Sequence, residues 1–139
     1  YDTVFCNQVL EHVSSPENAL REIHRILKPH GVLILAAPHL SRLHEEPHDY
    51  YRYTQHGFGF LLKKAGFSDI RTTTAGGLLS FFFHQVSTVF LSVVWGIPVV
   101  SALCFFLNKI ILVKSVVWLD ERAGTQRKFP VNNIAIAVK

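Results

Sequence analysis

Two short apolar runs near the start of the chain constrain its fold more than any other feature. They lie at residues 4–6 and 32–37, and the segment between them has the pattern of a single helix. Ser15 and Pro16 suit the N-cap and first position of that helix, and residues 28–31 are typical of a helix end. A continuous apolar run bounded by turns is typical of a strand covered on both faces. The order strand, helix, strand therefore predicts a right-handed parallel crossover.

The rest of the chain extends this unit into an α/β domain. A polar, histidine-rich loop covers residues 39–48, and Thr54 is suited to cap a helix over residues 55–64. Residues 70–74 and 131–138 have the β-branched or alternating pattern of strands. Apolar residues make up 49% of the chain and charged residues 17%, which argues against disorder.

A long apolar segment, residues 78–119, separates the last two predicted strands. Its first part, residues 78–107, contains no Asp, Glu, Lys or Arg, and a turn signal at residues 96–98 interrupts it. Three interpretations stay open: a membrane-spanning helix, which needs about 20 apolar residues, a helical pair in the bilayer interface, or a buried helical cap or dimer surface. Trp95 and Trp118 would serve as anchors in the interfacial arrangement.

Charge and cysteine content limit the partners and the compartment. The net charge is +4 with a pI near 9.3, but the basic residues are scattered, so nucleic acid is not an expected partner. Ordinary solvated surface is the better interpretation of this charge, and anionic lipid headgroups are the alternative that stays open. Cys6 and Cys104 lie in separate apolar runs, which favours free thiols in a reducing compartment. We therefore expect a cytoplasmic protein, at the cytoplasmic face of a membrane if the apolar segment binds one.

The histidine-rich loop raises the question of a metal site. His44 and His48 occur there with Glu45, Glu46 and Asp49. Their spacing fits no compact zinc pattern, and polar residues are ordinary in an exposed loop. The sequence therefore predicts no bound metal.

Two stretches carry a motif. Residues 2–13 read Asp-x-Val-x-x-Asn-x-Val-Leu-Glu-His-Val, and residues 16–31 read Pro-x-x-Ala-Leu-x-Glu-Ile-x-Arg-x-Leu-Lys-Pro-x-Gly. In these stretches the chain resembles the second half of a class I S-adenosylmethionine-dependent methyltransferase, in the group of small-molecule methylases. Residues 47–54, Pro-x-Asp-x-x-Arg-Tyr-Thr, with the later Ala-Gly-Phe at residues 65–67, resemble a subset often associated with glycan and lipid biosynthesis.

The resemblance implies a partial Rossmann-like sheet. Its four strands would be the fourth to the seventh of the family's sheet, with the seventh antiparallel. Residues 1–77 would be the C-terminal half of the methyltransferase domain, residues 78–119 a hydrophobic helical insertion, and residues 120–139 a loop and the final strand. An insertion at that point would lie beside the acceptor site, which favours an apolar or lipid-linked acceptor.

The family's glycine-rich loop and the acidic residue that holds the cofactor ribose have no counterpart in this sequence. We therefore expect a chain truncated at its N-terminus and inactive by itself. Its first strand would then expose one hydrogen-bonding side unless a partner covers it.

The same resemblance suggests a set of site residues. The predicted cofactor contacts are Asn7, Gln8 and His12. The predicted general base is His48 or Asp49, because methyl transfer to a hydroxyl group releases a proton. The predicted acceptor-site residues are His39, Tyr50, Arg52 and Tyr53. Two alternatives stay open: His12 has a structural role, and the Asp49, Arg52 and Tyr53 side chains merely anchor the loop.

The function expected from this resemblance is methyl transfer to an oxygen of a small or lipid- or glycan-linked acceptor, with S-adenosylmethionine as cofactor. The alternative is a non-catalytic, methyltransferase-like module that binds a membrane or another protein. A nicotinamide-dependent enzyme is disfavoured, because the Leu-Lys-Pro-His-Gly turn at residues 27–31 belongs to the methyltransferase pattern.

Overall fold

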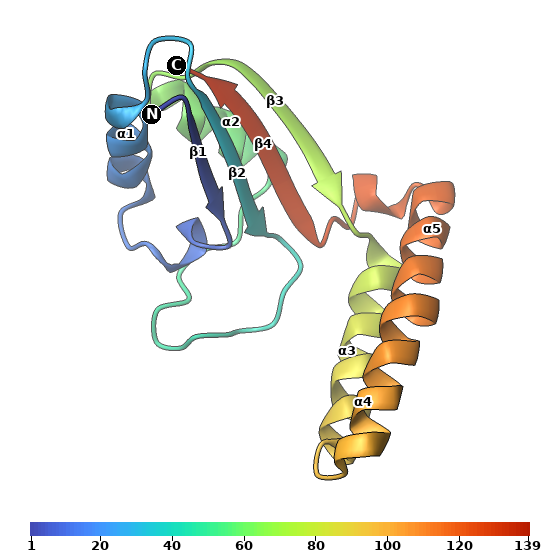
Figure 1. Cartoon of the computed structure of the whole chain (residues 1–139). Helices are drawn as coiled ribbons and strands as arrows, with labels where there is room; N and C mark the ends of the chain where they lie inside the picture. Colours follow the sequence, from blue (N-terminus) through green and yellow to red (C-terminus); the bar gives the residue numbers. More distant parts are fainter. The chain divides into compact units, whose positions relative to one another are not determined.

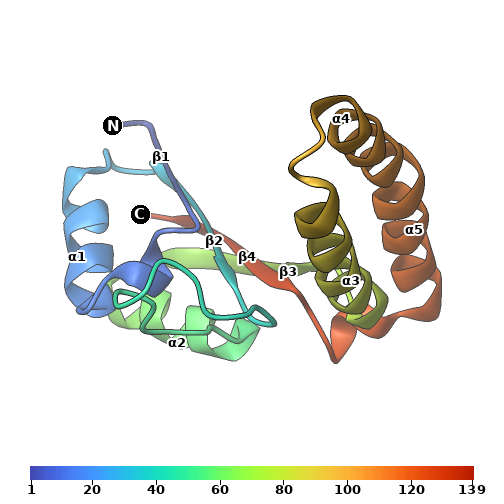
Figure 2. The ribbon, with the colours of Figure 1, turned by 90° about the horizontal axis from the view of Figure 1, so that it is seen from below.

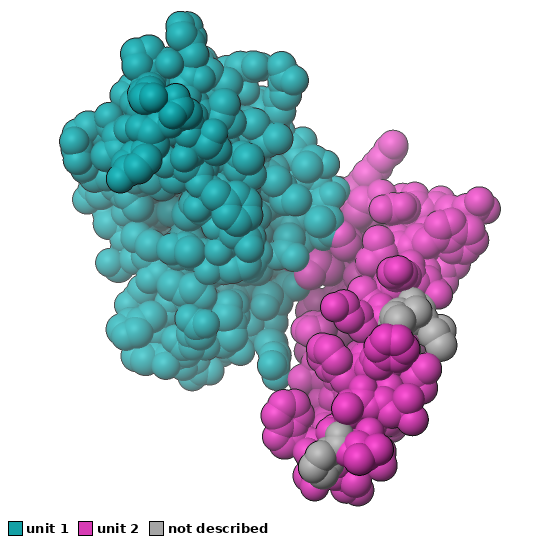
Figure 3. Space-filling model, viewed as in Figure 1, with its two compact units in different colours: residues 1–75, 132–139 teal, residues 76–131 magenta. Residues whose placement is uncertain are grey.

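A computed structural model describes residues 1–97, 99–109 and 113–139. The chain divides into two units, which Figure 3 shows in different colours. Unit 1 contains residues 1–75 and 132–139, and unit 2 contains residues 76–131.

Unit 1 is built on a mixed four-stranded sheet, seen in Figures 1 and 2. Its strands are β1 (Thr3–Asn7), β2 (Val32–Pro38), β3 (Ser68–Ala75) and β4 (Asn132–Val138), in the order β1-β2-β4-β3. Strand β1 is parallel to β2, which confirms that the two strands are joined by a parallel crossover. Strand β4 is antiparallel to both of its neighbours, as predicted for the last strand. The fold class is therefore α/β, as expected, with the antiparallel last strand that the family resemblance implied.

Helices α1 (Pro16–Ile26) and α2 (Gln55–Lys64) pack on one face of this sheet, and a short 3-10 turn, η1 (Leu10–His12), follows β1. Thr54 caps α2 as predicted, since its hydroxyl oxygen accepts a hydrogen bond from the Gly57 N–H at 3.0 Å. Ser15 occupies the predicted N-cap position of α1, with Pro16 following it.

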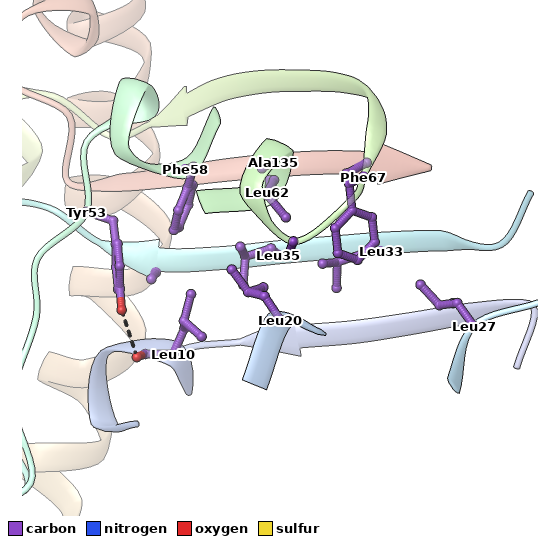
Figure 4. Close-up of a cluster of buried hydrophobic side chains, with 13 residues drawn as sticks. Leu10, Leu20, Leu27, Leu33, Leu35, Tyr53, Phe58, Leu62, Phe67 and Ala135 are labelled. Carbon is purple, nitrogen blue, oxygen red and sulfur yellow. Dashed lines mark hydrogen bonds between the residues drawn. The ribbon is translucent and has the colours of Figure 1, made fainter. Parts of the chain in front are cut away.

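The core of unit 1 lies between this sheet face and the two helices (Figure 4). Leu33 and Leu35 alternate along β2 and are fully buried. They meet apolar side chains from α1 and α2, among them Leu20, Leu27, Phe58 and Leu62. Burying a leucine or phenylalanine side chain contributes about 2 kcal/mol, so this layer supplies most of the cohesion of unit 1.

The opposite face of the sheet departs from the prediction. We expected residues 32–37 to be covered on both faces, but Ile34 is only half-buried. On the strands beside β2, Phe5 is 68% and Ile136 is 43% exposed. These side chains are exposed because α1 and α2 both pack on the other face of the sheet. Strand β1 also forms one edge of the sheet.

Unit 2 is helical. It contains α3 (Leu78–Val94), α4 (Pro98–Leu107), the π-helical segment η2 (Asn108–Val113), α5 (Lys114–Ala123) and a 3-10 turn, η3 (Thr125–Arg127). Helices α3 and α5 pack side by side (Figures 1 and 2). The apolar segment is broken between α3 and α4, so it is not the single long helix of the spanning interpretation. Within the described residues, no helix combines the length and the apolar character needed to cross a membrane.

One buried carboxylate joins the two ends of unit 2. Asp120, near the end of α5, is 1% exposed. Its oxygens accept hydrogen bonds from the N–H groups of Gly77 (3.0 Å), Leu79 (3.0 Å) and Ser80 (2.7 Å), and from the Thr125 hydroxyl. Asp120 therefore supplies the N-terminal cap and the negative charge that α3 lacks in its own first turn.

This contact explains why residue 77 is a glycine and why Asp120 is stabilised in its ionised form. A Cβ atom at Gly77 would lie 2.6 Å from Asp120 Oδ1 and 2.1 Å from Thr125 Oγ1, so only glycine fits. Burial opposes the charge on Asp120, but hydrogen bonds from Ser80 and Thr125 outweigh it and hold the pKa of Asp120 below its usual value.

We predict that Asp120→Asn lowers the stability of unit 2 by about 3 kcal/mol, because the new amide N–H groups face N–H donors. Both tryptophans, Trp95 and Trp118, lie in unit 2, so tryptophan fluorescence during urea unfolding reports on it. Since the folded pKa is depressed, the stabilisation is present above the unfolded pKa of about 4 and is lost as pH falls further. Glu121→Gln, an exposed neighbour, is the matched control; equal midpoints for the two variants would contradict this account.

Candidate functional site

Polar side chains gather at the carboxyl ends of β1 and β2. Asn7 ends β1 and is exposed, and Gln8 follows it with a positive φ of 54°. The Gln8 backbone N–H donates to the Ala36 carbonyl oxygen at 2.9 Å, and its side-chain amide donates to Asn132 Oδ1 at 3.1 Å. These amides therefore lie at the edge where open α/β sheets bind their ligands.

The loop after β2 is docked on the η1 turn. The backbone N–H groups of Tyr50 and Tyr51 both donate to the Glu11 carbonyl oxygen, at 2.9 and 3.2 Å. In addition, His12 Nδ1 lies 2.9 Å from the His48 carbonyl oxygen. The structure thus brings His12 and His48, predicted for different roles, into direct contact.

Asp49 and Arg52 form a bidentate ion pair. Arg52 donates to the two Asp49 oxygens at 2.6 and 2.7 Å, and the His44 backbone N–H donates to Asp49 Oδ2 at 3.0 Å. The Asp49 side chain is only 2% exposed. The Arg52 hydrogen bonds, followed by the His44 N–H, hold the pKa of Asp49 far below its usual value despite burial. Both oxygens are occupied, an arrangement that suits holding the loop better than accepting a proton.

The predicted acceptor-site residues differ in exposure. His48 and Tyr50 are exposed, and His48 Nδ1 lies 2.9 Å from the Tyr50 hydroxyl oxygen. Tyr53, in contrast, is 5% exposed, donates its hydroxyl hydrogen to the Leu10 carbonyl oxygen at 3.0 Å, and stacks on Phe58 (Figure 4). Burial raises the pKa of Tyr53 well above its usual value. Tyr53 is therefore a core residue.

The structure also assembles a cluster that the sequence did not reveal. Glu11 is fully buried, and its ligand atom lies within 4.8 Å of those of His12 and His44. In the sequence, His44 was grouped with the residues of its own loop, whereas the structure places it against the η1 turn. In the sequence, the adjacent pair Glu11-His12 in the first motif was the available signal for this cluster.

Residues 1–35 match the family model described as "Methyltransferase domain". No curated protein matches the chain. Among solved structures, phosphoethanolamine N-methyltransferase 2 of Haemonchus contortus, crystallised with phosphomonomethylethanolamine and S-adenosylhomocysteine, aligns with 100% of this chain and 33% of its own, at 19% identity and a TM-score of 0.55. A methyltransferase of Archaeoglobus fulgidus aligns with 99% of this chain and 59% of its own, at 15% identity and a TM-score of 0.56.

The strand order and these alignments agree. The chain contains part of a class I methyltransferase fold. It spans 33% to 59% of the length of the two methyltransferases. The [4+2]-cyclase SpnF also aligns with 100% of this chain, at 20% identity and a TM-score of 0.55. A methyltransferase fold can thus support another reaction, so the reaction has to be argued from site residues.

We predict that Arg52→Lys destabilises unit 1 by about 1 to 2 kcal/mol, because lysine cannot form the bidentate pair with Asp49. Unit 1 contains residues 1–75 and 132–139, so hydrogen exchange of the backbone amides of these residues, measured across a urea titration, follows its unfolding. The Asp49 pKa is depressed in the folded state, so the ion pair stabilises the fold fully above the unfolded pKa of about 4. The destabilisation caused by Arg52→Lys should therefore have its full size at pH 7 and become smaller as the pH falls below about 4.

The matched control for this prediction is Arg71→Lys. Arg71 forms a comparable pair with Asp69, but both side chains are exposed, at 76% and 57%. An exposed pair contributes little, so this variant should unfold like the wild type. An Arg52→Lys midpoint equal to that of Arg71→Lys would mean that the buried pair does not stabilise the loop.

Proposed function

We propose that these residues form the acceptor-side part of an S-adenosylmethionine-dependent methyltransferase that methylates an oxygen of a small or lipid- or glycan-linked acceptor. The observation that carries the proposal is the strand order β1-β2-β4-β3 with an antiparallel β4, combined with the family match over residues 1–35. Two aligned phosphoethanolamine methyltransferase structures contain S-adenosylhomocysteine or S-adenosylmethionine, which supports the cofactor assignment.

The cofactor would lie at the carboxyl end of β1. Asn7 and Gln8 present exposed amide groups there, which offer both donors and acceptors to an amino acid moiety. The residues therefore fit the group, which when bound supplies a methyl group on a positively charged sulfur. The His12 ring is held by the His48 carbonyl and faces Glu11, so we assign it to the neighbouring cluster.

His48 is the better general base of the two candidates. When its Nδ1–H donates to the Tyr50 oxygen, its Nε2 carries the lone pair that can take the proton of an acceptor hydroxyl. We assign Asp49 and Arg52 a positioning role, because their hydrogen bonds hold the loop that carries His48. His39, directly after β2, and Tyr50 would line the acceptor site, and Tyr53 would support it from the core.

An exposed apolar stripe on α3 of unit 2 supports the proposal that the protein binds a lipid surface. Phe82, Val86, Val89 and Val93 recur at helical spacing on α3 and are 48% to 80% exposed. Trp95, in the turn between α3 and α4, is 79% exposed. A soluble protein rarely leaves such a stripe uncovered. We propose that this stripe lies in the interface of a membrane, at its cytoplasmic face, with a protein partner as the alternative.

The cofactor assignment predicts that the full-length protein binds S-adenosylhomocysteine in isothermal titration calorimetry. Asn7→Ala should weaken binding about tenfold, the equivalent of one lost hydrogen bond. His48→Asn should leave the affinity unchanged, since His48 is assigned to the acceptor. Asn18→Ala, an exposed asparagine on α1, is the control. Absence of binding by the wild type would remove the methyltransferase proposal.

The membrane assignment predicts that the protein floats with phosphatidylserine-containing vesicles in a density gradient. Val89→Ser combined with Val93→Ser should leave the protein at the bottom, because both side chains belong to the exposed stripe. Leu43→Ser combined with Phe60→Ser, equally exposed in unit 1, should still float. If the wild type stays at the bottom and elutes as an oligomer, the stripe is a protein interface instead.

A further inference from the structure

Glu11 is a buried carboxyl group without a hydrogen-bond partner in the described part of the chain. The residue is 0% exposed, and neither carboxylate oxygen has a hydrogen-bond partner among the residues that the structure describes. Burying an ionised carboxylate in this way costs several kcal/mol unless another group compensates for it. Arg52 is a permanent cation that interacts electrostatically with Glu11, but its hydrogen bonds go to Asp49 and to the carbonyl oxygens of Tyr51 and Arg42. The Glu11 oxygens therefore remain available to a ligand.

The imidazole rings of His12 and His44 lie close to this carboxylate, and each ring is oriented by a backbone carbonyl oxygen near its Nδ1 atom. His12 Nδ1 lies 2.9 Å from the His48 carbonyl oxygen, and His44 Nδ1 lies 3.1 Å from the Arg42 carbonyl oxygen. A carbonyl oxygen only accepts, so in the neutral rings Nδ1 carries the hydrogen and Nε2 carries the lone pair. Histidines that bind metals typically donate their other ring N–H to a carbonyl or carboxylate in this way.

The distances are compatible with a single ion. His12 Nε2 lies 3.8 Å from Glu11 Oε1, and the ring centroids of His12 and His44 are 4.9 Å apart. The ligand atoms of the three residues lie within 4.8 Å of one another. Two ligands of a tetrahedral zinc ion are about 3.4 Å apart, so small side-chain rotations would complete the geometry.

We infer that Glu11, His12 and His44 bind a divalent transition-metal ion of the zinc type. Two imidazoles and one carboxylate suit zinc and disfavour magnesium and calcium, which prefer oxygen ligands alone. Glu45, with Oε2 at 3.9 Å from His12 Nε2, is the candidate fourth ligand. The ion would neutralise Glu11 and join the η1 turn to the loop after β2. This inference does not depend on the proposed function, because it rests on the cluster alone.

The inference is tested by zinc titration of the EDTA-treated, dialysed full-length protein in a calorimeter, with zinc as the only probe. We expect one tight site, and a rise in the thermal unfolding temperature on zinc addition. Glu11→Gln keeps the shape of the side chain but removes its charge, and His44→Ala removes a ligand from a half-exposed loop. Each variant should lower the zinc affinity roughly tenfold or more.

The chain has eight histidines, so a control for unspecific binding is essential. His56→Ala removes an exposed histidine on α2, outside the cluster, and should bind zinc like the wild type. If Glu11→Gln fails to fold, His44→Ala against His56→Ala still decides the question. The inference is overturned if the wild type binds no zinc, or if the His44→Ala and His56→Ala variants bind it equally well.

Discussion

The candidate site of unit 1 depends on the backbone carbonyl groups of Leu10 and Glu11, which hold the loop after β2 in place. Between them they accept hydrogen bonds from the Tyr50 and Tyr51 backbone and from the Tyr53 hydroxyl. A long polar loop has little apolar surface to bury, so it is positioned chiefly by such directional bonds. The loop that carries His48 therefore stays in place because a turn directly after β1 presents two carbonyls to it. The adjoining core then fixes the turn itself, since Leu10 is only 1% exposed.

Much of the fold could be predicted because local signals and the hydrophobic pattern agreed. The Thr54 cap and the apolar runs on β1 and β2 are short-range features, and all three occur where expected. The antiparallel last strand was predicted through a family resemblance and not from its own residues. Coverage of the sheet was harder to predict, because periodicity shows that Ile34 is apolar but not whether a helix packs on it.

The site was less predictable, for a physical reason. Tyr53 was expected to face the acceptor, yet its ring stacks on Phe58 in the core. A tyrosine in a loop can face either the core or the solvent, and its residue type alone does not indicate which. The approach of His44 to Glu11 depends on how the loop folds back, and loop residues leave no periodic pattern in a sequence. Asp49 was recognised as a functional candidate, but only the bidentate contact with Arg52 shows that its oxygens are already engaged.

Unit 2 has two parts that differ in how freely their residues can change: the base, formed by Gly77, Asp120 and Thr125, and the exposed apolar stripe of α3. At the base, Gly77 has no room for a Cβ atom because Asp120 and Thr125 occupy that space, so these three positions can change only together. Toward the turn at Trp95, the exposed apolar side chains of α3 contribute little to the packing of the unit, and substitutions there carry a small folding penalty. Selection can therefore change what the exposed face of α3 binds without weakening the contact of Asp120 with Gly77 and Thr125 inside unit 2. Related sequences should accordingly covary at the base, whereas along the stripe they can exchange one apolar side chain for another.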